Sequence, residues 1–320
     1  TVFFCSVGFT ACFRLLKKGG IQVFIFLALS VGMCIIQDAV GSGLAAAFGL
    51  DPLLGLCMGS MPLVGGHGTS GSFGPLLEET YGVSGALTVA LAAATYGLVS
   101  GSMMGGPIAR ARVEKLGLKS TAKAEGNAVD EAASPIDGQK FTNAAAFLAV
   151  AIGIGTIIFT FFKNVGLTMP AYIGAMLCAA AIRNIWDAKN TDLPMEEIDA
   201  LGGLSLNLYL AMAMMNLKLW QLAALALPMI VILLVQTVVM FLYANYAVFN
   251  IMGRDYEAAA MTTAFCGFGM GATPNAMANM RALQEKYGPA PRAFFIVPLV
   301  GSLFVDFFNS MVLTTFMNVL

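Results

Sequence analysis

Residues 65–74 read GGHGTSGSFG, a run of glycines and hydroxyl side chains that also contains His67, the only histidine of the chain. Strongly apolar segments flank this run on both sides. Of the 320 residues, 58% are hydrophobic and 11% are charged, which is typical of an integral membrane protein. The sequence therefore predicts a polar and conformationally permissive segment inside a protein whose main solvent is the bilayer.

Apolar runs that approach the about 20 helical residues needed to cross a hydrocarbon layer recur along almost the whole chain. They predict an all-α membrane protein with spans at residues 2–13, 21–48, 83–108, 141–162, 170–182, 204–215, 219–249 and 294–319. The polar segment 110–140 separates an N-terminal half, 1–109, from a C-terminal half, 141–320, and we interpret it as a cytoplasmic linker. The net charge of −1 indicates no nucleic-acid partner, and the six cysteines show no metal-binding or disulfide spacing.

A second glycine-rich run, CGFGMGATPNAMANM at residues 266–280, occupies the matching place in the C-terminal half. Each run follows a long span and an aspartate, has a Gly-x-Gly core followed by a threonine, and leads to Tyr-Gly. The matching pairs are Gln37 with Gln236, Asp51 with Asp255, Thr69 with Thr273, and Tyr81 with Tyr287. We interpret the pattern as an internal repeat with re-entrant hairpins at 52–80 and 256–287. The first half begins almost directly with the repeated unit, so we expect N-terminal spans to be missing here.

Basic residues indicate the orientation, because Lys and Arg collect in cytoplasmic loops. The densest clusters are Arg14/Lys17/Lys18, Arg110/Arg112/Lys115 and Arg281/Lys286/Arg292. Placing all three in the cytoplasm, with an odd number of spans between the hairpins, makes the repeat inverted: the first hairpin enters from outside and the second from the cytoplasm.

Unwound backbone at membrane depth is tolerated where it lines a polar cavity, and half-helices that end there can bind anions and Na⁺. The two runs therefore favour a secondary transporter with inverted topology. The alternative is that the glycines only allow helices to pack closely.

Three segments resemble the bacterial sodium:glutamate symporter family: GGHGTSGSFGPLLEETYG from Gly65, LSLNLYLAMAMMNLKLWQLAALALPM from Leu204, and the run from Cys266. The resemblance covers the chain outside the linker. It implies Na⁺-coupled uptake of glutamate across the bacterial inner membrane by alternating access, with two related halves and a homodimer in the lipid bilayer. Na⁺ would be the coupling ion, without a further cofactor. A Na⁺-coupled carrier of another small dicarboxylate, such as malate or citrate, is the alternative.

The hairpin tips supply the predicted glutamate-binding residues, since N–H groups and hydroxyls at helix N-termini bind carboxylates. They are Gly66, His67, Gly68, Thr69, Ser70, Gly71, Ser72, Gly271, Ala272, Thr273, Pro274 and Asn275, together with Asn207 in an apolar span. Interhelical hydrogen bonding explains Asn207 almost as well. His67 could relay protons, although a lone buried histidine is more often neutral and hydrogen-bonded.

Asp306, in LFVDFFNSM, is expected near the middle of its span, where an isolated acid usually faces a cavity or a partner. We predict that Asp306, Asn309 and Thr273 bind Na⁺, because oxygen ligands suit a hard cation. A hydrogen bond that serves only helix packing is the alternative. Asp38 is a weaker candidate, since we expect it near the outer interface, where an acid costs less.

Gly68-Thr69-Ser70-Gly71 matches the Gly-x-Ser-Gly pattern of intramembrane serine proteases. Such an enzyme needs a histidine from another helix as its base, whereas His67 lies in the same run. We therefore predict that the protein is not an enzyme. A channel is also disfavoured, because channels present rings of equivalent groups rather than two inverted hairpins with a midplane acid.

Overall fold

The computed structural model describes residues 1–12, 14, 20–120, 137–164, 171–189, 191–215 and 219–320, and within them every regular element is a helix. The predicted all-α fold is confirmed. The chain forms two compact units, one made of Thr1–Lys18 with Ala124–Met212 and the other of Gly19–Lys123 with Ala213–Leu320. This grouping cuts across the predicted halves, since each unit takes segments from both sides of the polar segment 110–140.

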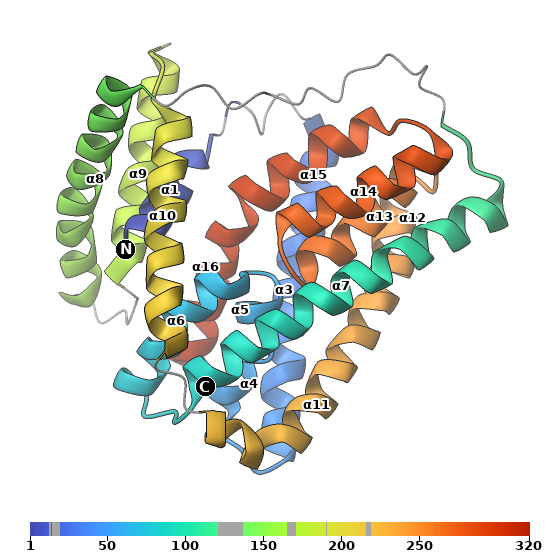
Figure 1. Cartoon of the computed structure of the whole chain (residues 1–320), viewed down its shortest axis with the longest axis horizontal. Helices are drawn as coiled ribbons and strands as arrows, with labels where there is room; N and C mark the ends of the chain where they lie inside the picture. Colours follow the sequence, from blue (N-terminus) through green and yellow to red (C-terminus); the bar gives the residue numbers. More distant parts are fainter. Residues whose placement is uncertain (13, 15–19, 121–136, 165–170, 190, 216–218) are drawn as a thin grey trace. The chain divides into compact units, whose positions relative to one another are not determined.

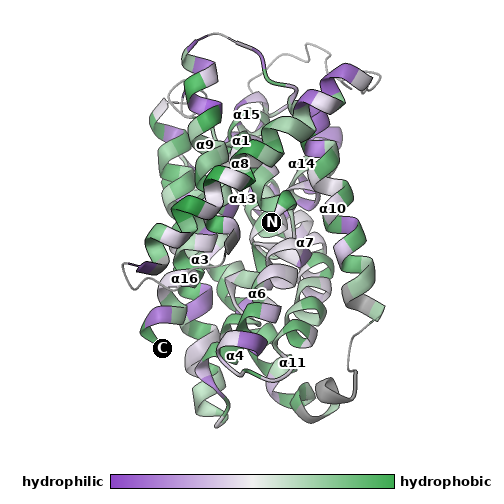
Figure 2. Cartoon of the chain, turned by 90° about the vertical axis from the view of Figure 1, so that its left-hand side faces the viewer, coloured by the Kyte–Doolittle hydropathy of each residue, from purple (hydrophilic) through white to green (hydrophobic). Residues whose placement is uncertain are grey.

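Four helices in the described part are long and apolar enough to cross a membrane: Gly20–Ala47, Ala86–Leu116, Gly138–Phe162 and Leu225–Ile251. A bent pair, Pro291–Gly301 with Val305–Val319, makes a fifth if it is counted as one span. Hydrophobic residues predominate along the long helices (Figure 2). These helices are those of a multi-pass membrane protein. The predicted spans 2–13, 170–182 and 204–215 overlap the helices Val2–Thr10, Ala171–Ala188 and Met195–Met215, which do not meet the same test. Residues 13 and 170 lie outside the described residues.

The first unit contains α1 (Val2–Thr10), α8 (Gly138–Asn164), α9 (Ala171–Ala188) and most of α10 (Met195–Met215), and α9 packs between α1 and α8 (Figure 1). Glycines bring α8 and α9 together, because a Cβ on Gly174 would overlap the carbonyl oxygen of Gly155. The outer face of α8 exposes Ile154, Ile157 and Phe161, as expected for a helix that faces lipid.

The second unit is built from two series of helices, which Figure 1 shows in blue to green and in orange to red. The first series is α3 (Gly20–Ala47), α4 (Pro52–Leu56), α5 (Ser60–Leu63), α6 (Gly66–Thr80) and α7 (Ala86–Leu116). The second is α11 (Leu219–Leu242), the π-helix η1 (Tyr243–Val248), α12 (Phe249–Ile251), α13 (Tyr256–Gly269), α14 (Thr273–Tyr287), α15 (Pro291–Leu303) and α16 (Val305–Val319). In each series, shorter helices connect two long segments.

The shorter helices of the second unit occupy residues 52–80, which we call hairpin 1, and residues 256–287, which we call hairpin 2. These segments are the ones predicted to be re-entrant hairpins, and their re-entrant course stays a prediction. The two series also pack against each other. Helix α7 of the first series contacts α11 of the second, and α16 of the second series contacts α3 of the first.

The helix α7 differs from the prediction, because it continues to Leu116, beyond the expected end at residue 108. Arg110 Nε lies 2.9 Å from Glu114 Oε1, an i,i+4 pair that stabilises the last turns, and Gly117 ends the helix with a left-handed φ of 61°. The start of the predicted linker is therefore helical rather than a loop. Residues 121–136 of that linker lie outside the described residues.

Candidate functional site

Each hairpin begins at an aspartate that caps its first helix. Asp51 Oδ1 accepts a hydrogen bond from the Leu53 N–H at 2.9 Å, and Asp255 Oδ1 accepts one from the Ala258 N–H at 2.7 Å. Such side chains satisfy N–H groups that have no partner inside the helix. The two aspartates paired by the sequence repeat thus have the same local role.

Hairpin 1 turns at Gly65 and Gly66, where Gly66 has a positive φ of 61° that glycine adopts without steric cost. Helix α6 starts at this residue, so most of the run 65–74 is helical. The unwound part is therefore narrower than the predicted tip, which extended over the whole run. The reason is that the small residues after Gly66 still form the regular hydrogen bonds of a helix.

The polar side chains of the first turns of α6 bond locally. Ser70 Oγ donates to the Gly66 carbonyl at 2.7 Å, and Ser72 Oγ donates to the Gly68 carbonyl at 3.2 Å. His67 Nε2 lies 3.1 Å from Thr95 Oγ1 of α7. Each hydroxyl oxygen can still accept a hydrogen bond, for instance from an ammonium group.

Hairpin 2 turns at residues 270–272, and Thr273 begins α14. Two asparagines one turn apart tie this helix to α7. Asn275 Nδ2 donates to the Leu98 carbonyl at 2.9 Å, and Asn279 Nδ2 donates to the Gly101 carbonyl at 3.2 Å. Hairpin 2 is thus attached to α7 through polar side chains as well as by apolar packing.

The two turns meet. A Cβ added to Gly66 would lie 3.3 Å from the carbonyl oxygen of Gly271, so the two backbones approach directly. A glycine on α7 also lets that helix lie close to the turn of hairpin 2, because a Cβ on Gly97 would overlap the Met270 carbonyl oxygen. Close packing, the alternative role for glycine, therefore operates at Gly97, in the same place where the turns come together.

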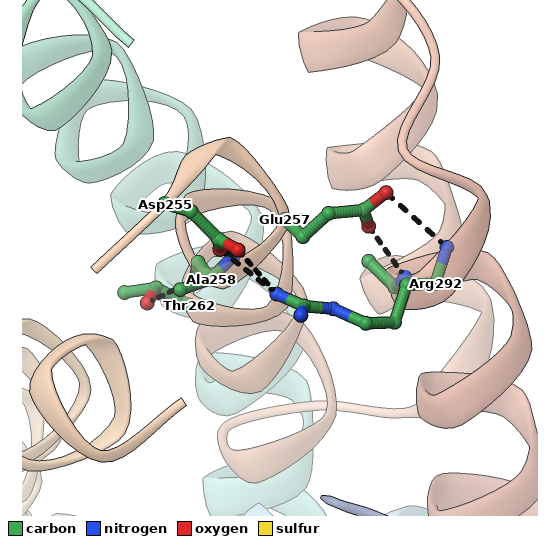
Figure 3. Close-up of polar contacts among 6 residues, drawn as sticks. Asp255, Glu257, Ala258, Thr262 and Arg292 are labelled. Carbon is green, nitrogen blue, oxygen red and sulfur yellow. Dashed lines mark hydrogen bonds and ion pairs between the residues drawn. The ribbon is translucent and has the colours of Figure 1, made fainter. Parts of the chain in front are cut away.

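The base of hairpin 2 is closed by charged groups (Figure 3). Arg292 binds both carboxylate oxygens of Asp255 through its Nη2, at 2.9 and 2.7 Å. Glu257 accepts the backbone N–H groups of Arg292 at 3.3 Å and of Ala293 at 2.8 Å, and so caps α15. Arg292 is therefore engaged at the start of the hairpin rather than at its tip.

A buried polar cluster joins α3, the start of α5 and α16. Asp38 Oδ1 accepts the Ser60 N–H at 2.7 Å, and Ser60 Oγ lies 2.8 Å from Asp38 Oδ2 and 2.6 Å from Asn309 Oδ1. Asn309 Nδ2 also donates to the Ser60 carbonyl at 3.2 Å. All three residues are buried, and we call them the Asp38 cluster. Asp38 is buried within the protein, because α4 and α5 pack over that face of α3. Its expected position near the outer interface of the membrane stays a prediction.

Further oxygen atoms border this region. Gln37 Nε2 donates to the Gly269 carbonyl at the end of α13, and Gln236 Nε2 donates to the Gln37 carbonyl. The side-chain oxygens of both glutamines are buried and have no hydrogen-bond partner in the described part of the chain. The two glutamines paired by the sequence repeat thus lie next to each other.

The family model described as Sodium/glutamate symporter matches residues 1–289. The sodium/glutamate symporter of Escherichia coli (strain K12) is 39% identical over 98% of this chain and 80% of its own length. That of Haemophilus influenzae (strain ATCC 51907 / DSM 11121 / KW20 / Rd) is 34% identical over 98% of this chain and 79% of its own length. This chain belongs to the sodium/glutamate symporter family. The predicted family is confirmed, and the protein is a transporter rather than an enzyme.

The structure of this family member brings together many of the predicted site residues, but not all. The predicted residues of both tips and the cation candidates lie in the second unit. Thr273 lies against α15, since its Oγ1 would be 3.1 Å from a Cβ added to Gly301. Asn207 belongs to the first unit instead, where its side chain is exposed on α10.

Ser60 is the residue of this symporter that sequence reasoning missed. Its segment, LGLCMGSMPL at residues 54–63, is apolar, and a single serine in such a segment is usually a packing residue. The available signal was local: Gly59 before it and Pro62 after it both disfavour a continuous helix. The structure places Ser60 at that interruption, where α5 starts.

Proposed function

We propose that this symporter takes up glutamate together with Na⁺ by alternating access, with the two hairpin turns forming the binding site. The observation that supports it most directly is the close approach of Gly66 to the Gly271 carbonyl, which brings two interruptions of helical backbone to one place. Broken helices inside a membrane protein offer positive N-terminal ends to anions and free carbonyls to cations. The names of the relatives support glutamate, and they give no support to a malate or citrate carrier.

The carboxylates of glutamate would bind where α6 and α14 begin. The proposed ligands are the backbone and side chains of Gly66, His67, Gly68, Thr69, Ser70, Gly71, Ser72, Gly271, Ala272, Thr273, Pro274 and Asn275. The first turns of both helices have N–H groups without partners in their own helix, which favour anions. Asn207, on α10 of the first unit, is the remaining proposed ligand.

Na⁺ would bind at Asp306, Asn309 and Thr273. Asp306 lies in the first turn of α16, directly after the bend from α15, and its side chain is partly buried. No described residue donates a hydrogen bond to its carboxylate, which leaves the oxygens available to a cation.

The remaining proposals concern the whole transporter. We infer that the two series of the second unit are an inverted repeat, with hairpin 1 entering from outside and hairpin 2 from the cytoplasm. The short helices that lie between long segments in each series, and the equivalent aspartate caps, support this. A homodimer in the bacterial inner membrane is the assembly that the family resemblance favours.

Uptake of labelled glutamate into proteoliposomes tests the proposed function. We expect uptake that requires an inward Na⁺ gradient, saturates with glutamate and is not reduced by excess malate. Uptake that is equally fast without Na⁺, or that malate competes away, would contradict the proposal. Failure to saturate would indicate a channel instead.

A further inference from the structure

When Asp38 is ionised, the contacts of the Asp38 cluster need more protons than its side chains contain. The Ser60 hydroxyl has one proton, yet its oxygen lies 2.8 Å from Asp38 Oδ2 and 2.6 Å from Asn309 Oδ1. An ionised carboxylate and an amide oxygen only accept hydrogen bonds. One of the two contacts therefore holds two oxygens against each other without a proton between them.

Turning the Asn309 amide over does not remove this deficit. Its nitrogen would then donate to Ser60 Oγ, and the hydroxyl would be free to donate to Asp38. The amide oxygen would instead face the Ser60 carbonyl oxygen, at the 3.2 Å now spanned by a hydrogen bond. In both orientations, two buried oxygens face each other without a donor, an arrangement that a bound cation would stabilise.

The negative charge of this region also favours a bound cation. Asp38 is completely buried, and the carboxyl groups of Asp38 and Asp306 both lie within electrostatic range of the Cys34 thiol on α3. None of the ion pairs formed by described residues includes either aspartate. A carboxylate that is withdrawn from water, fully for Asp38 and partly for Asp306, is costly without a positive partner, so a bound cation would offset the desolvation.

We propose that Asp38 and Ser60 complete the Na⁺ site of Asp306 and Asn309, so that the ion binds to three elements at once. This inference rests on the proposed function and deepens it. Because Ser60 begins α5, which leads directly to the turn at Gly66, a bound ion would hold hairpin 1 on α3 and α16. Na⁺ binding would thereby fix one half of the glutamate site, which is a physical basis for coupled transport.

The second series of helices does not reproduce this cluster. The position after Gln236 that corresponds to Asp38 is Thr237, and the residue as far after Asp255 as Ser60 is after Asp51 is Ala264. The second hairpin thus packs without a carboxylate at the equivalent place. The repeated scaffold does not require the Asp38 cluster, which favours a role in ion binding.

The Na⁺ dependence of Asp38→Asn and Ser60→Ala tests the inference. In proteoliposomes, we expect Ser60→Ala to raise the Na⁺ concentration for half-maximal glutamate uptake by roughly 10- to 100-fold, the usual effect of weakening a metal site.

In detergent without glutamate, NaCl should raise the unfolding temperature of the unchanged protein above its value in choline chloride. Asp38→Asn should lose this difference, and this readout does not depend on transport.

Matched controls are available on neighbouring elements. Ser30→Ala removes a buried hydroxyl on α3, which donates only to the Phe26 carbonyl of its own helix. Asp51→Asn makes the same change from carboxylate to amide at an exposed helix cap, where asparagine also caps well. Both variants should keep the Na⁺ dependence of the unchanged protein.

The outcomes separate this inference from the proposed function. Unaltered Na⁺ dependence in both Ser60→Ala and Asp38→Asn would overturn the inference alone. Uptake that needs no Na⁺ in the unchanged protein would contradict the proposed function and the inference with it. Unaltered Na⁺ dependence together with an altered response to a proton gradient would assign the missing positive charge to a proton, and would also overturn the inference.

Discussion

At the scale of single residues, the hydroxyl at the start of α14 is the clearest test of how glutamate binds. Thr273→Val keeps the shape of the side chain but removes a hydroxyl, so we expect the dissociation constant for glutamate to rise by about tenfold or more, the effect of losing one hydrogen bond to a charged ligand. Thr69→Val makes the same change in hairpin 1. Isothermal titration at saturating Na⁺ would measure both variants.

Arg281→Gln is the control for these threonine variants. The Arg281 side chain is exposed and lies far from the turn along α14. We therefore expect the substitution to leave the affinity for glutamate unchanged. If Arg281→Gln or Arg292→Gln abolished binding while both valine variants kept it, arginine rather than the helix N-termini would hold the substrate carboxylates.

Asp306 provides the second prediction at this scale. Asp306→Asn keeps the size of the side chain but removes its negative charge, so the Na⁺ concentration for half-maximal uptake should rise at least about tenfold. A correctly folded Asp306→Asn protein with normal Na⁺ dependence would eliminate Asp306 as an ion ligand. Size-exclusion chromatography of the purified variant checks the folding.

At the scale of elements, the packing of hairpin 2 on α7 depends on glycine. Gly97→Ala would place a methyl group against the Met270 backbone carbonyl, which cannot move without shifting the turn. We expect a loss of about 1–3 kcal/mol in stability from overpacking and a marked loss of glutamate uptake. Gly106→Ala on the same helix has no atom within 4 Å of the new methyl group and should be neutral or stabilising. Equal thermal unfolding of the two variants would refute this account of the tip.

At the scale of the whole molecule, the orientation of the two hairpins is the decisive property. Glu79 and Glu285 are exposed near the C-terminal ends of α6 and α14, which lie away from the two turns. Glu79→Cys should react with a membrane-impermeant thiol reagent from outside the cell, whereas Glu285→Cys should react only from the cytoplasm. The native cysteines are all buried, so the unchanged protein serves as the background. Labelling of both positions from one side would reject the inverted topology.

Much of the fold could be predicted from the sequence because it depends on local properties. The apolar length of 20–47 and the glycine turn at Gly66 are determined by residues close together in the chain, as are the caps at Asp51 and Asp255. The same locality explains why a break between helices could be expected at each glycine-rich run. It also explains the error at the end of α7, where polar residues resembled a loop although an i,i+4 ion pair stabilises the helix there.

Only the tertiary structure decided which distant residues meet. That Gly66 lies close to Gly271, and that Asp38 and Asn309 share the Ser60 hydroxyl, depends on how α3, α7, α16 and the hairpins pack. In an apolar sequence, hydropathy cannot rank these contacts, because nearly every helix face could pack against protein or lipid. Small residues that permit backbone contact and buried polar groups that require partners select one packing, and both act only once the helices are assembled.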